Sequence, residues 1–427
     1  MKIYESPAPE QLAKILKRPV KDYEQIEKIV RPILEKVQRG GDHALRKFAL
    51  EYDHVDLTSL WVTNEEFEEA ERLVSKDLKD AIKVAKKNIE KFHLAQRQED
   101  LKMKVMDGVI CSRRSVPIQK VGLYVPGGTA PLFSTVLMLA VPAQIAGCKE
   151  IILASPSNRM GELNPVILYT AKLTGVDKVL KLGGAQAIAG MAYGTESVPK
   201  VDKIFGPGNQ YVTAAKQLVA RDSVSIDMPA GPSEVMVVVD EQANAAFAAS
   251  DLLSQAEHGV DSQVVLVTDS RQKAEEVEAE VSRQLALLSR KEIAAASLEN
   301  SCIIVAKEDD ETIHVINEYG PEHLIINVDK PNRLVKAVVN AGSVFIGPYT
   351  PESAGDYASG TNHTLPTNGW AKSYSGVSVD SFVKKITYQE ITAKGLEKLG
   401  PSIEKMAEAE LLEAHKNAVT LRLQSLK

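Results

Sequence analysis

The spacing of hydrophobic residues separates a helical first part of the chain from a later part in which strands and helices alternate. Up to about residue 105, apolar residues recur every three or four positions between charged ones, as in residues 64–97, and this spacing predicts amphipathic helices. From Val121 onward, short apolar runs such as VGLYV and EIILA are followed by glycine-containing turns and helical segments. This alternation predicts parallel strands with helices packed on both faces of a sheet.

A second series of strand-like runs begins at SEVMVVVD, residues 233–240, and continues to GSVFIG, residues 342–347. After about Gly376 the strand pattern fades, and a helical segment closes the chain. We therefore predict an α/β fold with two tandem Rossmann-like parallel-sheet domains, a helical N-terminal region and a C-terminal helical tail. The predicted ranges are 1–105 for the helical region, 106–232 and 233–376 for the two α/β domains, and 377–427 for the tail.

Composition and charge narrow the class of protein. The 427 residues are 44% hydrophobic and 25% charged, which is typical of globular proteins, and a net charge of −6 argues against nucleic acid or an anionic membrane as a partner. The longest apolar stretch, residues 133–147, is too short to span a bilayer, and the first residues lack the apolar core of a signal peptide. The three cysteines form no CxxC pair, so we expect neither a thiolate zinc site nor a disulfide framework, and a cytoplasmic location.

The stretch DLLSQAEHG, residues 251–259, has the pattern of a helix that ends near Gly259. Gln255 and His258 are three residues apart and therefore project from one face of that helix. They are either polar surface residues of its last turn or two ligands of a shared metal ion.

Three glycine-rich turns, YVPGGTAP, KLGGAQAI and FGPGNQYV, follow predicted strands. Ligands of open α/β sheets bind where the carboxyl ends of the strands meet such turns, so we expect binding sites at those ends. Glycine turns can present N–H groups to phosphates, but the sequence contains neither G-x-G-x-x-G nor a Walker A motif. A dinucleotide site and tight turns without a ligand fit these stretches equally well.

Glu322 and His323 stand directly before an apolar, strand-like run. A carboxylate beside an imidazole can share proton transfers, although two solvated residues of a turn would look the same. Asp356 and His363 lie in a long polar loop, residues 347–367, of a kind that is uncommon in compact domains unless it is functional. We interpret His363 as structural and Asp356 as a candidate ligand.

In the last helical segment, Glu410 and His415 are five residues apart and fit an ordinary exposed amphipathic helix. Four of the polar residues would nevertheless form a nitrogen and oxygen donor set suited to zinc or another divalent ion if the fold brought them together. They are Gln255, His258, Asp356 and His415.

Seven stretches in this order resemble the histidinol dehydrogenase family: GLYVPGG, GPGNQYVTAAK, MPAGPSEV, DLLSQAEHG, GPEHL, AGDYASGTNHTLPT and AHKNAV. The resemblance runs from about residue 20 to the last helix, and the one departure is Gly320, where the family often has alanine. It implies a zinc enzyme that oxidises L-histidinol to L-histidine, the last steps of histidine biosynthesis, with two NAD+ in succession through the aldehyde L-histidinal.

The resemblance also implies roles for individual residues. The zinc ligands would be Gln255, His258, Asp356 and His415, and the acid/base pair Glu322 and His323. The NAD+ contacts would be Tyr124, Gln186 and Asn209, and the substrate contacts Ser233, Glu410, His323 and the zinc ligands. It further implies a homodimer with shared active sites, in which the partner subunit lends the helix that carries Glu410 and His415.

Two kinds of alternative remain at this stage. On the same scaffold, the substrate of an NAD-dependent dehydrogenase could be another small diol or amino alcohol, because a fold does not determine a substrate. From other classes, a zinc hydrolase or a non-catalytic metabolite-binding protein could also consist of two α/β lobes.

Overall fold

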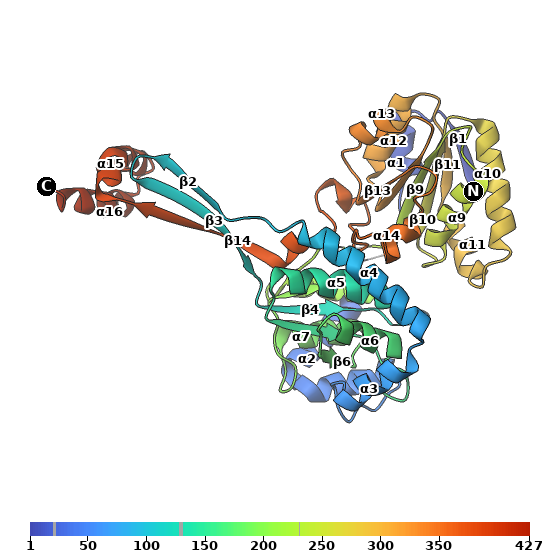
Figure 1. Cartoon of the computed structure of the whole chain (residues 1–427), viewed down its shortest axis with the longest axis horizontal. Coiled ribbons are helices and arrows are strands. Elements are labelled where there is room, and N and C mark those ends of the chain that lie inside the picture. The colour runs from blue at the N-terminus through green and yellow to red at the C-terminus, as the bar shows by residue number, and fades with distance from the viewer. Residues whose placement is uncertain (20–22, 128–130, 230) are drawn as a thin grey trace.

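The computed structural model describes residues 1–19, 23–127, 131–229 and 231–427. It has two α/β domains, each built on a parallel sheet, and an arm that projects away from both (Figure 1). The predicted α/β fold with two parallel sheets is therefore confirmed, and the arm was not predicted.

The first domain contains a five-stranded parallel sheet with the strand order β6-β5-β4-β7-β8. Its central strands are buried on both faces, which explains their uninterrupted apolar sequences. The strands are β4 (Lys120–Tyr124), β5 (Glu150–Ala154), β6 (Lys178–Leu180), β7 (Lys203–Phe205) and β8 (Ser225–Ile226). The helices between them are α5 (Phe133–Ala146), α6 (Pro165–Leu173), α7 (Gly184–Tyr193) and α8 (Gln210–Val219).

The predicted N-terminal helices exist, and most of them pack on this first domain. Helix α2 (Tyr23–Tyr52) lies on α7 and α8, α3 (Asn64–Leu73) lies on α6, and α4 (Lys76–Leu94) lies on α5. The buried side chains of α2, among them Leu45 and Phe48, belong to the same apolar core as those of α7. The helical region therefore completes a layer of the first domain.

The second domain contains a six-stranded parallel sheet with the order β1-β11-β10-β9-β12-β13. Its strands are β1 (Lys2–Glu5), β9 (Glu234–Val239), β10 (Gln263–Thr268), β11 (Cys302–Val305), β12 (His323–Asn327) and β13 (Ser343–Ile346). Its helices are α1 (Pro9–Ile15), α9 (Ala245–Ala256), α10 (Arg271–Leu285), α11 (Lys291–Glu299), α12 (Asp309–Tyr319), α13 (Asn332–Ala337) and α14 (Glu352–Tyr357). The first residues of the predicted helical region thus form an edge strand, β1, which four residues of mixed burial could not reveal.

The arm combines a three-stranded antiparallel sheet of order β14-β3-β2 with two terminal helices. Its elements are β2 (Leu101–Met106), β3 (Val109–Pro117), β14 (Val383–Ile391), α15 (Ala393–Ala409) and α16 (Glu413–Gln424). Two 3-10 turns, η1 (Trp370–Lys372) and η2 (Val379–Phe382), precede β14. The terminal helices confirm the predicted helical tail, but β14 corrects the expectation that strands end near Gly376. Most of β14 is exposed, so it lacks the apolar run by which the other strands were predicted.

Among the described residues, no helix combines the length and the apolar character that crossing a membrane requires.

Candidate active site

The candidate acid/base pair lies at the amino edge of the second sheet. His323 is the first residue of β12, and Glu322 precedes it, beside the first residue of β9, Glu234. Helix α9 follows β9 and runs back across the sheet, so its C-terminal end, with Gln255, returns to the same edge. The candidate pair therefore does not lie at the carboxyl ends of the strands, where we expected binding sites, because these polar residues lie at the amino ends of their strands.

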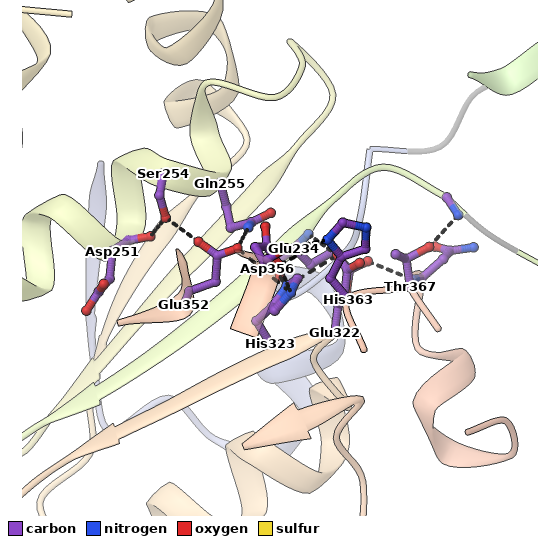
Figure 2. A network of polar contacts seen from close by, with 12 residues as sticks. Glu234, Asp251, Ser254, Gln255, Glu322, His323, Glu352, Asp356, His363 and Thr367 are labelled. Atoms are coloured by element: carbon purple, nitrogen blue, oxygen red, sulfur yellow. Dashed lines mark hydrogen bonds and ion pairs between the residues drawn. The ribbon is translucent and has the colours of Figure 1, made fainter. Parts of the chain in front are cut away.

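The backbone of Glu234 holds both members of the pair (Figure 2). Its N–H donates to Glu322 Oε2 at 2.9 Å, and its carbonyl oxygen lies 3.1 Å from His323 Nδ1. The second bond requires a proton on Nδ1 and leaves Nε2 as the nitrogen that faces the site. Nε2 is buried and has no hydrogen-bond partner among the described residues.

Three carboxylates surround this imidazole. His323 Nε2 lies 3.5 Å from Asp356 Oδ1 and 3.9 Å from Glu352 Oε1, and Nδ1 lies 3.6 Å from Glu322 Oε2. Ligand atoms of His323, Glu352 and Asp356 all lie within 4.8 Å of one another. A buried cluster of three carboxyl groups around one imidazole offers the oxygen and nitrogen donors that bind a divalent cation.

Electrostatic effects in this cluster are large. Burial raises the pKa of Glu322 to about 8, and burial together with the neighbouring Asp356 carboxylate raises that of Glu352 to about 8. Burial alone would lower the pKa of His323, but the carboxylates of Glu322, Asp356 and Glu352 outweigh it and raise that pKa to about 10. The pKa of Asp356 is lowered, because its contact with His323 and the nearby His363 outweigh its burial. The protons held by this cluster are those that a divalent ion would replace.

Two of the four predicted metal ligands, Gln255 and Asp356, lie at this cluster. Gln255 is buried and donates from Nε2 to Glu352, while its Oε1 is buried without a partner among the described residues. His258 follows the end of α9 and is an exposed residue; partial desolvation of its ring lowers its pKa, and the charges of Asp356 and His323 also act on it. A free amide oxygen, a neutral imidazole and the Asp356 carboxylate fit the donors that zinc accepts.

The fourth predicted ligand lies elsewhere in the chain. His415 is in α16 and Glu410 caps α15, both exposed on the arm (Figure 1). The fold of one chain does not bring them to the cluster. Ser233 directly precedes Glu234, so it lies at the edge that carries the acid/base pair.

The predicted dinucleotide contacts lie at the carboxyl edge of the first sheet, each beside a glycine turn. Tyr124 ends β4 and its Oη accepts a bond from Gly184 N at 3.0 Å. Gln186, in the first turn of α7, donates to Asp53 at 3.3 Å, and the Asn209 side chain caps α8. All three thus have partners within the fold.

A cavity of about 840 Å³ adjoins the first of these turns at Gly127, and Tyr124, Gln186 and Asn209 are not among the described residues that line it. Asp53, Gly127 and Pro156 are among the residues that line it. The two domains meet at His363: its Nε2 lies 3.2 Å from Thr135 Oγ1 of α5, and its Nδ1 lies 2.9 Å from the Asp356 carbonyl oxygen. These contacts agree with the structural interpretation of His363.

Sequence reasoning missed Glu352 and Glu234. Glu352 and Asp356 are four residues apart, the spacing that places two side chains on one helix face, so a prediction of α14 would have paired them. Glu234 contributes its backbone N–H and carbonyl groups to the site, and a sequence pattern does not reveal such a contribution.

Comparison with known proteins agrees with this arrangement. The family model described as histidinol dehydrogenase matches residues 16–423. The chain is 60% identical over 427 residues to histidinol dehydrogenase of Bacteroides thetaiotaomicron, and 52% identical over 428 residues to that of Campylobacter jejuni. The matches cover 100% of this chain in both cases, and 100% and 99% of the relatives. A crystal structure of histidinol dehydrogenase from Elizabethkingia anophelis aligns with a TM-score of 0.97 at 50% identity, over 100% of this chain and 98% of that one.

The fold, the site and these matches define the chain as an oxidoreductase. It is therefore neither a zinc hydrolase nor a non-catalytic metabolite-binding protein. It belongs to the histidinol dehydrogenase family, and this membership implies a role in histidine biosynthesis.

Proposed function

We propose that this enzyme oxidises L-histidinol through L-histidinal to L-histidine with one zinc ion per subunit and two NAD+ in succession. The observation that carries the proposal is the placement of Gln255 and Asp356 beside His323, with the Gln255 Oε1 atom buried and without a partner among the described residues. Zinc on these donors would hold the imidazole and amine of histidinol and offset the charge of the carboxylates.

His323 is the proposed base for both oxidations. Its Nε2 takes the hydroxyl proton while the carbinol carbon loses a hydride, for which NAD+ is the acceptor. Its bond from Nδ1 to the Glu234 carbonyl supports this role, because that bond leaves Nε2 as the nitrogen that exchanges a proton with the site. The surrounding carboxylates hold a proton on Nε2 in the metal-free cluster, and a zinc ion bound beside them would favour its loss, so that Nε2 could act as the base.

Glu322 is the proposed base for hydration of the aldehyde. Water adds to the carbonyl carbon as the ionised Glu322 takes one of its protons, and the carbonyl oxygen takes the proton that His323 gained in the first oxidation. The neutral hydrate then loses the second hydride and a proton to give the acid. Burial raises the pKa of Glu322 to about 8, so the group can hold a proton near neutral pH.

The proposed dinucleotide site is the carboxyl edge of the first sheet, with Tyr124, Gln186 and Asn209. The cavity beside Gly127 supports this assignment. The seam between the two domains, which is the contact of Thr135 with His363, supports it too, because it keeps the carboxyl edge of the first sheet beside the cluster around His323.

The proposed assembly is a homodimer in the cytoplasm, in which each site receives Glu410 and His415 from the partner's arm. Two observations support it: the arm projects away from its own domains, and it exposes apolar side chains that a neighbour could cover (Figure 1). They include Leu101, Met103, Val105, Met406 and Leu411.

The test is the number of NADH molecules formed per histidinol consumed by the zinc-loaded enzyme. Two are expected with histidinol, and none after complete removal of zinc by a chelator, with recovery when zinc is returned. Faster NADH formation with another small diol or amino alcohol would support the alternative substrate. Full activity after verified removal of the metal would refute the zinc site.

A further inference from the structure

A buried ion pair lies behind the acid/base pair, and the proposed chemistry does not use it. Arg18, which follows α1, donates from Nε to Glu234 Oε1 at 2.6 Å and from Nη2 to Oε2 at 2.8 Å. Nη2 also donates to the Tyr319 carbonyl oxygen at 2.9 Å, and the guanidinium carbon lies 3.9 Å from the centre of the Tyr319 ring. The Arg18 and Glu234 side chains are only 16% and 3% exposed.

The stability of the fold does not explain well why this ion pair is buried. Burying two charges costs several kcal/mol per ion, and apolar residues of the same volume often stabilise a fold at least as well. What a bidentate, stacked arginine supplies is a fixed geometry, because its planar fork determines where both carboxylate oxygens lie.

The residue that Arg18 fixes, Glu234, is the one whose backbone holds the acid/base pair. The Glu234 N–H donates to Glu322 Oε2, and its carbonyl oxygen accepts the proton of His323 Nδ1. The Glu234 carboxylate also accepts from the Asn368 N–H at 2.7 Å, so the side chain is held from two sides. Rotation of this one residue would misalign both members of the pair.

We propose that Arg18 is a positioning residue: by clamping the Glu234 carboxylate it orients the two backbone groups that align Glu322 and His323. The assignment rests on the proposed function of that pair. It gives the segment after α1 a role in the reaction, although Arg18 touches neither Glu322 nor His323 in the described contacts.

The conservative variant Arg18→Lys tests this assignment. It keeps the charge and loses the fork, so we expect the single-turnover rate constant for NADH formation to fall about 10- to 100-fold, with little change in KM. That rate constant, measured with saturating enzyme in excess over histidinol, does not depend on the fraction of protein that is folded. The matched control is Arg271→Lys, which alters an exposed arginine paired with Glu5 and Glu275, and we expect wild-type rates from it.

A second variant tests the same assignment if the Arg18→Lys protein does not fold. Glu234→Gln keeps an acceptor for Asn368 and removes the carboxylate, and we expect a loss of the same order. Single-turnover rates equal to wild type in the folded Arg18→Lys protein, or in folded Glu234→Gln if the lysine variant does not fold, would overturn the positioning role. If the wild-type enzyme itself forms no NADH from histidinol, the proposed function fails, and this assignment fails with it.

Discussion

A site shared between subunits predicts that two inactive variants restore activity when their chains are mixed. Asp356 lies in α14 of the second domain and His415 in α16 of the arm, apart from each other in one chain (Figure 1). Asp356→Asn and His415→Asn each remove one proposed ligand from both sites of a homodimer. We expect each pure variant to retain less than about 1% of wild-type activity, because a lost zinc ligand weakens the metal and misplaces the substrate.

In a mixed dimer, one site collects both substitutions and the other collects neither. Random pairing of equal amounts makes about half of the dimers mixed, and each has one intact site of two. Activity should therefore recover to about a quarter of the wild-type value after the two variants are unfolded and refolded together in the presence of zinc. The matched control is Asp356→Asn mixed with His258→Asn: both residues serve the same chain's site, so mixing should restore nothing. No recovery in the first mixture, with mixed dimers verified by native mass spectrometry, would refute the shared site.

Four further variants test the chemistry and the fold. Glu322→Gln should slow aldehyde oxidation at least about tenfold more than alcohol oxidation, since only the aldehyde must be hydrated; equal losses in separate assays of the two steps would contradict its role. Gly206 has φ +119°, and an added Cβ would lie 2.0 Å from the Tyr124 carbonyl oxygen, so Gly206→Ala should lower the free energy of unfolding in urea by more than about 2 kcal/mol. Gly347→Ala, with positive φ but no atom within 4 Å of its Cβ, should cost clearly less. Burial raises the pKa of Asp251 to about 7, so the folded protein holds a proton that the unfolded chain loses near pH 4, and stability falls as the pH rises between these values. Asp251→Asn should therefore raise the free energy of unfolding at pH 8 by roughly 2–4 kcal/mol and change it little at pH 4; the same gain at both pH values would contradict this origin.

The two parallel sheets could be predicted because their strands are buried on both faces. Strands such as β9 and β10 consist almost entirely of valine, leucine, isoleucine or methionine, and this run is visible without any knowledge of partners. The arm could not be recognised in the same way. Its strand β2, LKMKVM, does alternate between apolar and charged residues, but the apolar side chains of Leu101, Met103 and Val105 remain about half exposed in a single chain.

The acid/base pair could be proposed from the sequence but not separated from two solvated turn residues. What distinguishes Glu322 and His323 is burial and the two bonds to Glu234, which lies 88 and 89 residues earlier in the chain. No local pattern carries that information. The placement of His415 is still harder to predict, because within one chain its helix packs chiefly on α15 of the arm.

The two domains contribute different chemistry because opposite edges of their sheets face each other. At the first domain's carboxyl edge, the turns need glycine because their backbone packs closely on Pro156. A Cβ at Gly127 or at Gly183 would come within 2.5 Å of that proline. At the second domain's amino edge, the ionisable groups come from the amino ends of β9 and β12 and from α14. A hydride transfer needs the acceptor ring and the carbinol carbon held about 3–3.5 Å apart, a tolerance that two loosely joined domains cannot meet. The bond between Thr135 and His363, together with the bond from His363 to the Asp356 backbone, ties the two edges at the proposed metal ligand itself. The seam between the domains therefore reaches the proposed site directly, so a shift between them would move the proposed ligand Asp356 relative to the first sheet.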